Sequence, residues 1–203
     1  MAALAAVIGI IGEVAMGIVP GITGHPDPRS LLDKSKVLFT REQVMAAVDK
    51  MADEINVFYG DESIVMIAVM TGAIMPAAWL ASRLKMPLQI DFVHATRYQS
   101  GLHGAELEYR VPPRMDLEGK KVLIVDDIFD EGDTLAAIKG SCEKRDAQSV
   151  HMAVLTRKMH DRGLPRDFAD FVGLDVPDVY VFGCGMDAYE EWRHLDEILA
   201  LEE

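Results

Sequence analysis

The stretch VLIVDDIFDEGDTL, residues 122–135, combines an apolar segment with an acidic loop. Its first four residues are aliphatic, which is typical of a strand that is covered on both faces in a parallel sheet. Asp126 and Asp127 follow at once, so they fall at the carboxyl end of the expected strand. Open α/β sheets bind their ligands beyond that end of the strands. Residues 122–135 therefore predict both a parallel sheet and a binding site at its edge.

Outward from this stretch, apolar strands alternate with helical segments. A helix is expected from residue 41 to about residue 56, because Thr40 and Gln43 form a capping box and apolar residues recur on one face. The remaining expected elements are strands at 63–70, 88–98, 106–111 and 149–156, short strands with turns at 170–187, helices at 73–84 and 133–145, a closing helical turn at 189–198 and a tail at 199–203. This alternation predicts an α/β fold with a mainly parallel, twisted sheet flanked by helices.

Composition limits the classes of partner. The chain has 203 residues, of which 50% are hydrophobic and 26% are charged, so a sizeable core is possible. The formal net charge of −13 argues against a nucleic-acid partner, because duplex binding needs a basic face. A few local donors and a metal ion can still bind small anions. Cys142 and Cys184 are the only cysteines, which predicts a reducing, cytoplasmic location. The six histidines lack metal-binding spacing, so we expect structural or surface roles for them.

The first 31 residues differ in composition from the rest. They are mostly small and aliphatic, with Glu13 inside the apolar run and no Lys or Arg before Arg29. Because a signal peptide needs a basic flank and a membrane span a longer uninterrupted run, we favour an extension and linker outside the fold. A membrane or targeting role is the alternative. The expected domain is residues 32–203, and no membrane partner is expected.

The acidic loop has a plain structural explanation, as a solvated turn and a helix cap. Against it, the apolar residues Ile128 and Phe129 lie between the acids. Residues 131–134 also bring a glycine, a hydroxyl and successive backbone N–H groups to a helix N-terminus, which is a cradle for phosphate. Asp126 and Asp127 can accept hydrogen bonds from ribose hydroxyls, or help to hold Mg²⁺ together with substrate phosphates. The loop therefore predicts the binding of a phosphorylated ribose.

Residues 122–135 resemble the phosphoribosyl-diphosphate signature of type I phosphoribosyltransferases. Four further motifs resemble the hypoxanthine-guanine phosphoribosyltransferases: VMTGAIMPAAWL (69–80), the diphosphate loop and its helix; IDFVHATRYQSG (90–101), the lid; VLTRK (154–158), the strand of a purine-reading lysine; and FVGLDVPDVYVFGCGMDAYEEWRHLDEI (171–198), the purine pocket. The resemblance covers about residues 36–201. It implies the family's sheet and a small hood built from the N- and C-terminal segments.

The resemblance also implies roles for individual residues. Asp130 would be the general base near N7 of the purine. The phosphoribosyl group would be bound by Asp126, Asp127, Glu131, Gly132, Asp133 and Thr134. The diphosphate would be bound by Met70, Thr71, Gly72 and Arg193, with a non-proline cis peptide between Met70 and Thr71. The purine would be bound by Ile128, Lys158, Tyr180, Val181 and Asp187, where Lys158 donates to the 6-oxo group and Tyr180 stacks on the base. Mg²⁺ would lie near Asp126, Asp127 and Asp187, and Tyr98 would belong to a closing lid.

The implied activity is transfer of 5-phosphoribosyl from 5-phosphoribosyl 1-diphosphate to N9 of hypoxanthine or guanine, in a homodimer or homotetramer. Taken singly, the lysine, tyrosine, aspartate and arginine of the purine pocket also have ordinary structural explanations. Glu131 stands where many family members have threonine, and its carboxylate would repel a phosphate unless it points to solvent.

A non-catalytic protein that binds phosphoribosyl diphosphate is the alternative, although the chain keeps Asp130 and has no basic module. A P-loop hydrolase is disfavoured because the chain has no GxxxxGK[ST] motif. A receiver domain is disfavoured because the strand at 149–156 ends without an aspartate.

Overall fold

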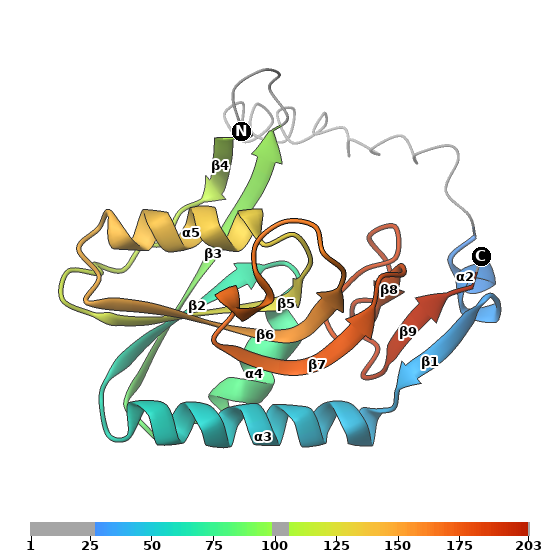
Figure 1. Ribbon diagram of the computed structural model, residues 1–203, viewed down its shortest axis with the longest axis horizontal. Coiled ribbons are helices and arrows are strands. Elements are labelled where there is room, and N and C mark those ends of the chain that lie inside the picture. The colour runs from blue at the N-terminus through green and yellow to red at the C-terminus, as the bar shows by residue number, and fades with distance from the viewer. Residues whose placement is uncertain (1–26, 99–105, 203) are drawn as a thin grey trace, which may run out of the picture.

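The computed structural model describes residues 27–98 and 106–202 (Figure 1). Six strands form one sheet in the order β4-β3-β2-β5-β6-β7. They are β2 (Ile64–Met70), β3 (Leu88–Tyr98), β4 (Glu106–Val111), β5 (Lys121–Phe129), β6 (Ser149–Met159) and β7 (Phe171–Pro177). β3, β2, β5, β6 and β7 run parallel, and β4 pairs with β3 in the antiparallel sense. The predicted α/β fold with a mainly parallel sheet is confirmed.

Helices cover both faces of this sheet. Figure 1 shows α5 (Asp133–Glu143) on one face, with α3 (Arg41–Tyr59) and α4 (Ile74–Ala81) on the other. The predicted capping box starts α3: the Thr40 side chain accepts from the backbone N–H of Gln43, and Gln43 Oε1 accepts from the Thr40 N–H at 2.9 Å. A short 3₁₀ helix, η1, spans Arg166–Phe168. Within the described ranges, no helix is both long and apolar enough to cross a membrane.

β2 and β5 lie at the centre of the sheet and form the middle of the core. All of β2 is buried except Met70, and residues 122–127 of β5 are buried. Burying one large aliphatic side chain contributes about 1.5–3 kcal/mol, so a strand made of such residues is held firmly in place. The carboxyl end of β5 is therefore a rigid support for Asp126 and Asp127.

A second, three-stranded antiparallel sheet forms the hood, in the order β1-β9-β8. Its strands are β1 (Ser35–Phe39), β8 (Val181–Phe182) and β9 (Ile198–Leu201). The helix α2 (Pro28–Asp33) joins it: Leu31 is buried with Phe182, and the Trp192 indole N–H donates to the Pro28 carbonyl at 2.9 Å. The expected boundary at residue 31 falls inside this helix, and residues 1–26 of the expected extension lie outside the described residues.

The structure of the hood differs from the helical turn and tail that were predicted for residues 189–203. The expected helical turn at 189–198 is wrong, since Tyr189, Glu190 and Trp192 have φ values of 54°, 69° and 66°. A right-handed helix requires negative φ throughout. The expected tail at 199–203 is also wrong in large part, because residues 198–201 form β9 and pair with β1. Pairing between the two ends of the chain overrides the local pattern.

Candidate active site

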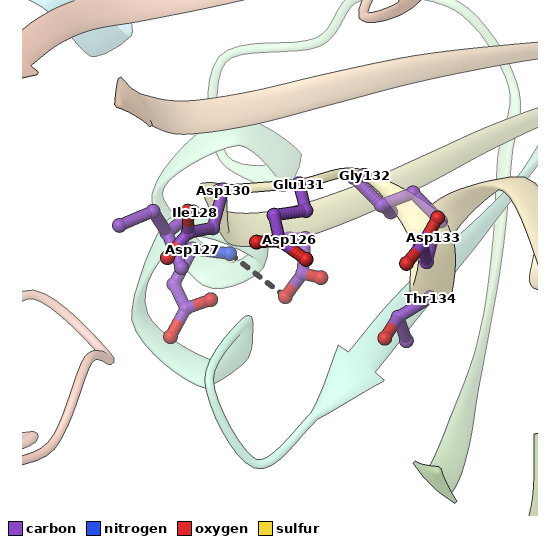
Figure 2. A pocket seen from close by; sticks show the side chains of 9 residues that line it. Asp126, Asp127, Ile128, Asp130, Glu131, Gly132, Asp133 and Thr134 are labelled. Carbon is purple, nitrogen blue, oxygen red and sulfur yellow. Dashed lines mark hydrogen bonds between the residues drawn. The ribbon is translucent and has the colours of Figure 1, made fainter. Parts of the chain in front are cut away.

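The carboxyl end of β5 opens into a cavity of about 340 Å³. Figure 2 shows the side chains around it, which come from β5, the following turn and the start of α5. The lining residues are Asp126, Asp127, Ile128, Asp130, Glu131, Gly132, Asp133, Thr134 and Leu135. All but Leu135 were predicted as site residues: Asp130 as the base and the others as substrate-binding residues. These predicted residues line one continuous surface.

The turn before α5 has the geometry of an anion site. Gly132 precedes the helix with φ +83°, and a Cβ there would lie 2.6 Å from the Phe129 ring, so glycine is required. α5 then begins at Asp133 and runs for 11 residues. The first backbone N–H groups of a helix have no partner within it and carry partial positive charge. The turn can therefore bind a phosphate through its backbone.

Glu131 in this turn has a cationic neighbour. Arg162 Nε lies 3.6 Å from Glu131 Oε1, and both side chains are about half exposed. The same guanidinium binds Asp178 through two hydrogen bonds of 2.7 and 2.9 Å. The backbone N–H of Leu164 donates to the Glu131 carbonyl at 2.9 Å. The segment after β6 thus supports the phosphate turn and places a positive charge beside the carboxylate that would repel a phosphate.

Asp126 and Asp127 are two adjacent acids in a buried position, with 9% and 8% of their surfaces exposed. The backbone N–H of Asp127 donates to Asp126 Oδ1 at 2.9 Å, and Thr156 Oγ1 donates to the Asp127 carbonyl at 2.9 Å. Burial raises the pKa of both carboxyls, and the charge of Asp127 raises the pKa of Asp126 further. The pair is therefore poised to take hydroxyl donors or a cation.

A second loop faces this acid pair. The peptide bond between Met70 and Thr71 is cis, which confirms that prediction. A Cβ on Gly72 would overlap the Asp127 carboxylate, and a Cβ on Gly185 would overlap the Gly72 carbonyl. Gly185 was not among the predicted site residues, because only short strands with turns were expected at 170–187. Its φ of +107° and its tight contact show that it brings the C-terminal loop against the end of β2.

Asp130 lies between two side chains from the end of β6. Lys158 Nζ donates to Asp130 Oδ2 at 2.8 Å, and His160 Nε2 lies 2.7 Å from Asp130 Oδ1. Partial burial raises the pKa of Asp130, but the hydrogen bonds of Lys158 and His160 and the charge of Lys158 outweigh burial and hold that pKa below its ordinary value. His160 was expected to be structural or at the surface. It is instead a direct partner of the predicted base.

The remaining predicted residues meet in the hood. Arg193 forms an ion pair of 2.6 Å with Asp187 and donates to the Gly185 carbonyl at 2.7 Å. The Tyr180 hydroxyl donates to the Asp187 carbonyl at 3.2 Å, and its ring stacks on Tyr189 with centroids 6.3 Å apart. The contact of Gly185 with Gly72, together with the Arg193 hydrogen bond to the Gly185 carbonyl, links the purine-pocket motif to the loop at Gly72.

Val181 and Tyr98 complete the predicted set. Val181 is buried in β8, which leaves its backbone as the group available to a ligand. Tyr98 ends β3, and its side chain lies outside the described residues, as do residues 99–105 of the expected lid.

Asp126 and Asp127 are also the best candidates for a metal site. In the part of the chain that the structure describes, no three potential ligands cluster around a metal position. Mg²⁺ does not need such a cage, because it binds one or two carboxylates together with substrate phosphates and water. Burial and mutual repulsion of the two carboxylates would be relieved by a cation. Asp187 is already engaged, with Oδ1 on Arg193 and Oδ2 accepting from the Glu190 N–H at 2.8 Å.

Comparison with known proteins agrees with this geometry. The family model of the phosphoribosyl transferase domain matches residues 35–191. A hypoxanthine-guanine phosphoribosyltransferase of Mycobacterium avium is 32% identical over 200 residues, which cover 95% of this chain and 96% of that protein. The Bacillus subtilis protein of the same name is 32% identical over 171 residues, 84% of this chain and 94% of its own. The crystal structure of a hypoxanthine phosphoribosyltransferase from Staphylococcus aureus superposes with a TM-score of 0.79 at 27% identity, covering 88% of this chain and 97% of that chain.

A parallel sheet with an acid pair and an amide turn at the end of one strand, matched by this family model, defines the chain as a phosphoribosyltransferase. The two relatives cover 95% and 84% of its length. The chain belongs to the hypoxanthine-guanine phosphoribosyltransferase family.

Proposed function

We propose that this protein is a purine salvage enzyme. It transfers 5-phosphoribosyl from 5-phosphoribosyl 1-diphosphate to N9 of hypoxanthine or guanine, which yields IMP or GMP and diphosphate. The observation that carries the proposal is the cavity at the end of β5, which brings together two buried carboxylates, an amide turn and Asp130, the hydrogen-bond partner of Lys158. A cytoplasmic location, and assembly as a homodimer or homotetramer, stay predictions from the resemblance.

The phosphoribosyl group is the ligand that this surface fits best. The carboxylates of Asp126 and Asp127 accept hydrogen bonds from the two ribose hydroxyls. The 5′-phosphate lies on the turn of residues 131–134, where backbone N–H groups and the Thr134 hydroxyl donate to it. The diphosphate meets the loop of residues 70–72, with Arg193 as its counter-charge.

The purine lies between the hood and Asp130. Tyr180 has 46% of its surface exposed, so its ring is available to stack on the base, and Ile128 lines the cavity. Val181 offers backbone groups to the edge of the base. Lys158 carries only donors, so it suits the 6-oxo group of hypoxanthine or guanine and not the amino group of adenine.

The reaction breaks the bond between C1′ and the diphosphate oxygen and forms a bond between C1′ and purine N9. Positive charge develops on the ribose as the C1′–O bond breaks, as in glycoside cleavage. The nearby carboxylates of Asp126 and Asp127 favour that charge. Asp130 accepts the N7 proton of the purine as N9 attacks. Its low pKa means that the carboxylate is ionised, and so able to accept a proton, at neutral pH.

Mg²⁺ fits the acid pair as described above. When bound, the ion would neutralise charge on the departing diphosphate. Asp126 and Asp127 would hold it together with the substrate. Arg193 acts from the other side, because its ion pair with Asp187 fixes the guanidinium beside the Gly72 loop.

The test is an assay with purified protein, 5-phosphoribosyl 1-diphosphate and Mg²⁺, with each purine base offered in turn and nucleotide detected by chromatography. We expect IMP from hypoxanthine and GMP from guanine, with negligible AMP from adenine. Equal rates with adenine would contradict the role of Lys158. Binding of the diphosphate substrate without nucleotide formation from any base would favour the non-catalytic alternative.

A further inference from the structure

Both carboxylate oxygens of Asp130 are bound, but their surroundings differ. Oδ2 accepts from Lys158, and Oδ1 faces His160 at 2.7 Å. The His160 side chain has only 6% of its surface exposed, whereas Asp130 has 42%. Oδ1 therefore faces a buried ring, whereas Oδ2 faces the lysine that the proposed function assigns to the purine.

The contacts of His160 define which of its nitrogens carries the proton. The backbone N–H of Arg162 donates to His160 Nδ1 at 3.1 Å, so Nδ1 has a lone pair and no proton. The proton of the ring is then on Nε2, and Nε2–H donates to Asp130 Oδ1. The guanidinium of Arg166 also donates to the His160 carbonyl, at 3.2 Å from Nη2. The contacts with Arg162 and Arg166 thus fix the position of His160, with Nε2 facing the Asp130 carboxylate.

Substrate binding changes the demands on Asp130. In the proposed function, Lys158 turns one of its donors to the 6-oxo group of the purine, and Oδ2 must receive the N7 proton. A carboxylate held by Lys158 alone would then lose its fixed orientation. His160 supplies a second hold that does not depend on the substrate.

We infer that His160 is a positioning residue for Asp130: its Nε2–H anchors Oδ1, so that Oδ2 is directed at the purine. This inference rests on the proposed function and deepens it. We expect an effect on activity of about 10–100-fold, by analogy with the hydrogen-bond partners that orient metal-binding side chains.

The two functions of the ring can be separated by a matched pair of variants. In His160→Gln the longer amide reaches the position of Nε2 and can donate to Asp130, but the acceptor for the Arg162 N–H is lost. In His160→Asn the shorter amide keeps an acceptor near the position of Nδ1 but does not reach Asp130. His151→Asn is the control, because His151 also contacts an aspartate, Asp170 at 3.0 Å, near the other end of β6.

The measurement is the single-turnover rate of nucleotide formation with saturating substrates, together with KM for each substrate and Tm. We expect His160→Asn to lower the single-turnover rate about 10–100-fold and KM to change less than about threefold. His160→Gln should keep the rate within about threefold of the parent. His151→Asn should leave the rate unchanged.

Three results would overturn the positioning role. One is a normal rate in His160→Asn. Another is an equal loss in the Asn and Gln variants, which would mean that the ring only supports the loop. The third is an effect on KM alone. Absence of turnover in the parent protein would count against the proposed function itself and not against His160 in particular.

Discussion

Replacement of Asp130 by asparagine removes the proposed base but leaves the size of the side chain almost unchanged. The amide cannot take the N7 proton, and general-base catalysis contributes about 10²–10⁴-fold to a rate. At about 1.36 kcal/mol for each tenfold change, this loss raises the activation free energy by about 2.7–5.4 kcal/mol. The structure limits the effect on folding. Asparagine has one acceptor oxygen in place of two, so either Lys158 or His160 loses its partner at a position that is 42% exposed.

A contact at so open a position is worth at most about 1 kcal/mol, which corresponds to about 2–4 °C in Tm for a chain of this length. We therefore expect kcat to fall at least about 100-fold while Tm falls by no more than about 4 °C. Asp170→Asn is the matched control, since Asp170 also accepts from a histidine and from a backbone N–H, that of Met152 at 2.8 Å. Steady-state assay and thermal melting of both variants test the reasoning. A kcat within about threefold of the parent in a well-folded D130N would refute the base assignment.

The same variant gives a stability test whose sign follows from the pKa. The folded-state pKa of Asp130 lies below 3.8, so its ionised form stabilises the fold. This contribution is complete above pH 3.8 and is lost as pH falls through the lower folded-state pKa. The difference in unfolding free energy between parent and D130N should therefore shrink below pH 3.8, as urea titrations from pH 3 to 7 would show. A difference that grows as the solution becomes more acidic would contradict the pairing of Asp130 with Lys158 and His160.

Three further variants address the rest of the site. Gly72→Ala should raise KM for 5-phosphoribosyl 1-diphosphate at least about tenfold, because the added Cβ would displace the Asp127 carboxylate. Gly140→Ala is the control: its Cβ meets nothing within 4 Å, so it should leave KM unchanged and raise stability by about 0.5–1 kcal/mol. Asp126→Asn should abolish turnover yet raise Tm in Mg²⁺-free buffer at neutral pH. The folded-state pKa of Asp126 is raised, so this acid destabilises the fold as pH rises from 3.8 through that pKa. An unchanged Tm would argue against a cost of burying this carboxylate. Arg162→Gln should raise KM for the diphosphate substrate about 3–10-fold, and adding Glu131→Gln should restore it; no recovery in the double variant would mean that the two side chains act independently.

The central part of the fold was predictable because its signals are local. The apolar run before Asp126 determines a buried parallel strand, and the capping box at Thr40 determines the start of α3. The turn at Gly132 was predictable for a related reason, since a glycine before a polar helix start is a short-range pattern. In each of these cases the residues that form the structure are neighbours in the sequence.

The hood was not predictable by the same means. β1 and β9 are short strands from opposite ends of the chain, so neither has a partner within reach of a local pattern. The apparent helical pattern at 189–198 fails because Trp192 packs into the hood and donates to Pro28, a contact across more than 160 residues. The resemblance implied a hood from both ends of the chain, but not the strands that build it.

His160 and Gly185 escaped prediction for different reasons. β6 runs to Met159, beyond the expected end at residue 156, and this extension alone brings the histidine ring to Asp130. No spacing rule links residues 130 and 160, because they meet only through the pairing of β5 with β6. Gly185 lies in a segment where only turns were expected, and its contact with Gly72 joins two loops that are far apart in the sequence, so no local pattern reveals it.

An acidic chain that binds a polyanionic substrate must place its own charges in different environments. Asp130 and Asp187 are paired with Lys158 and Arg193, so their charge is already balanced. Asp126 and Asp127 are buried side by side, and burial raises the pKa of both carboxyls; the charge of Arg193 offsets only part of this effect at Asp127. A bound cation would relieve the repulsion between these two carboxylates. A substrate that brings both hydroxyl donors and a magnesium diphosphate would meet that need, and by linkage the ion and the substrate would each strengthen the binding of the other.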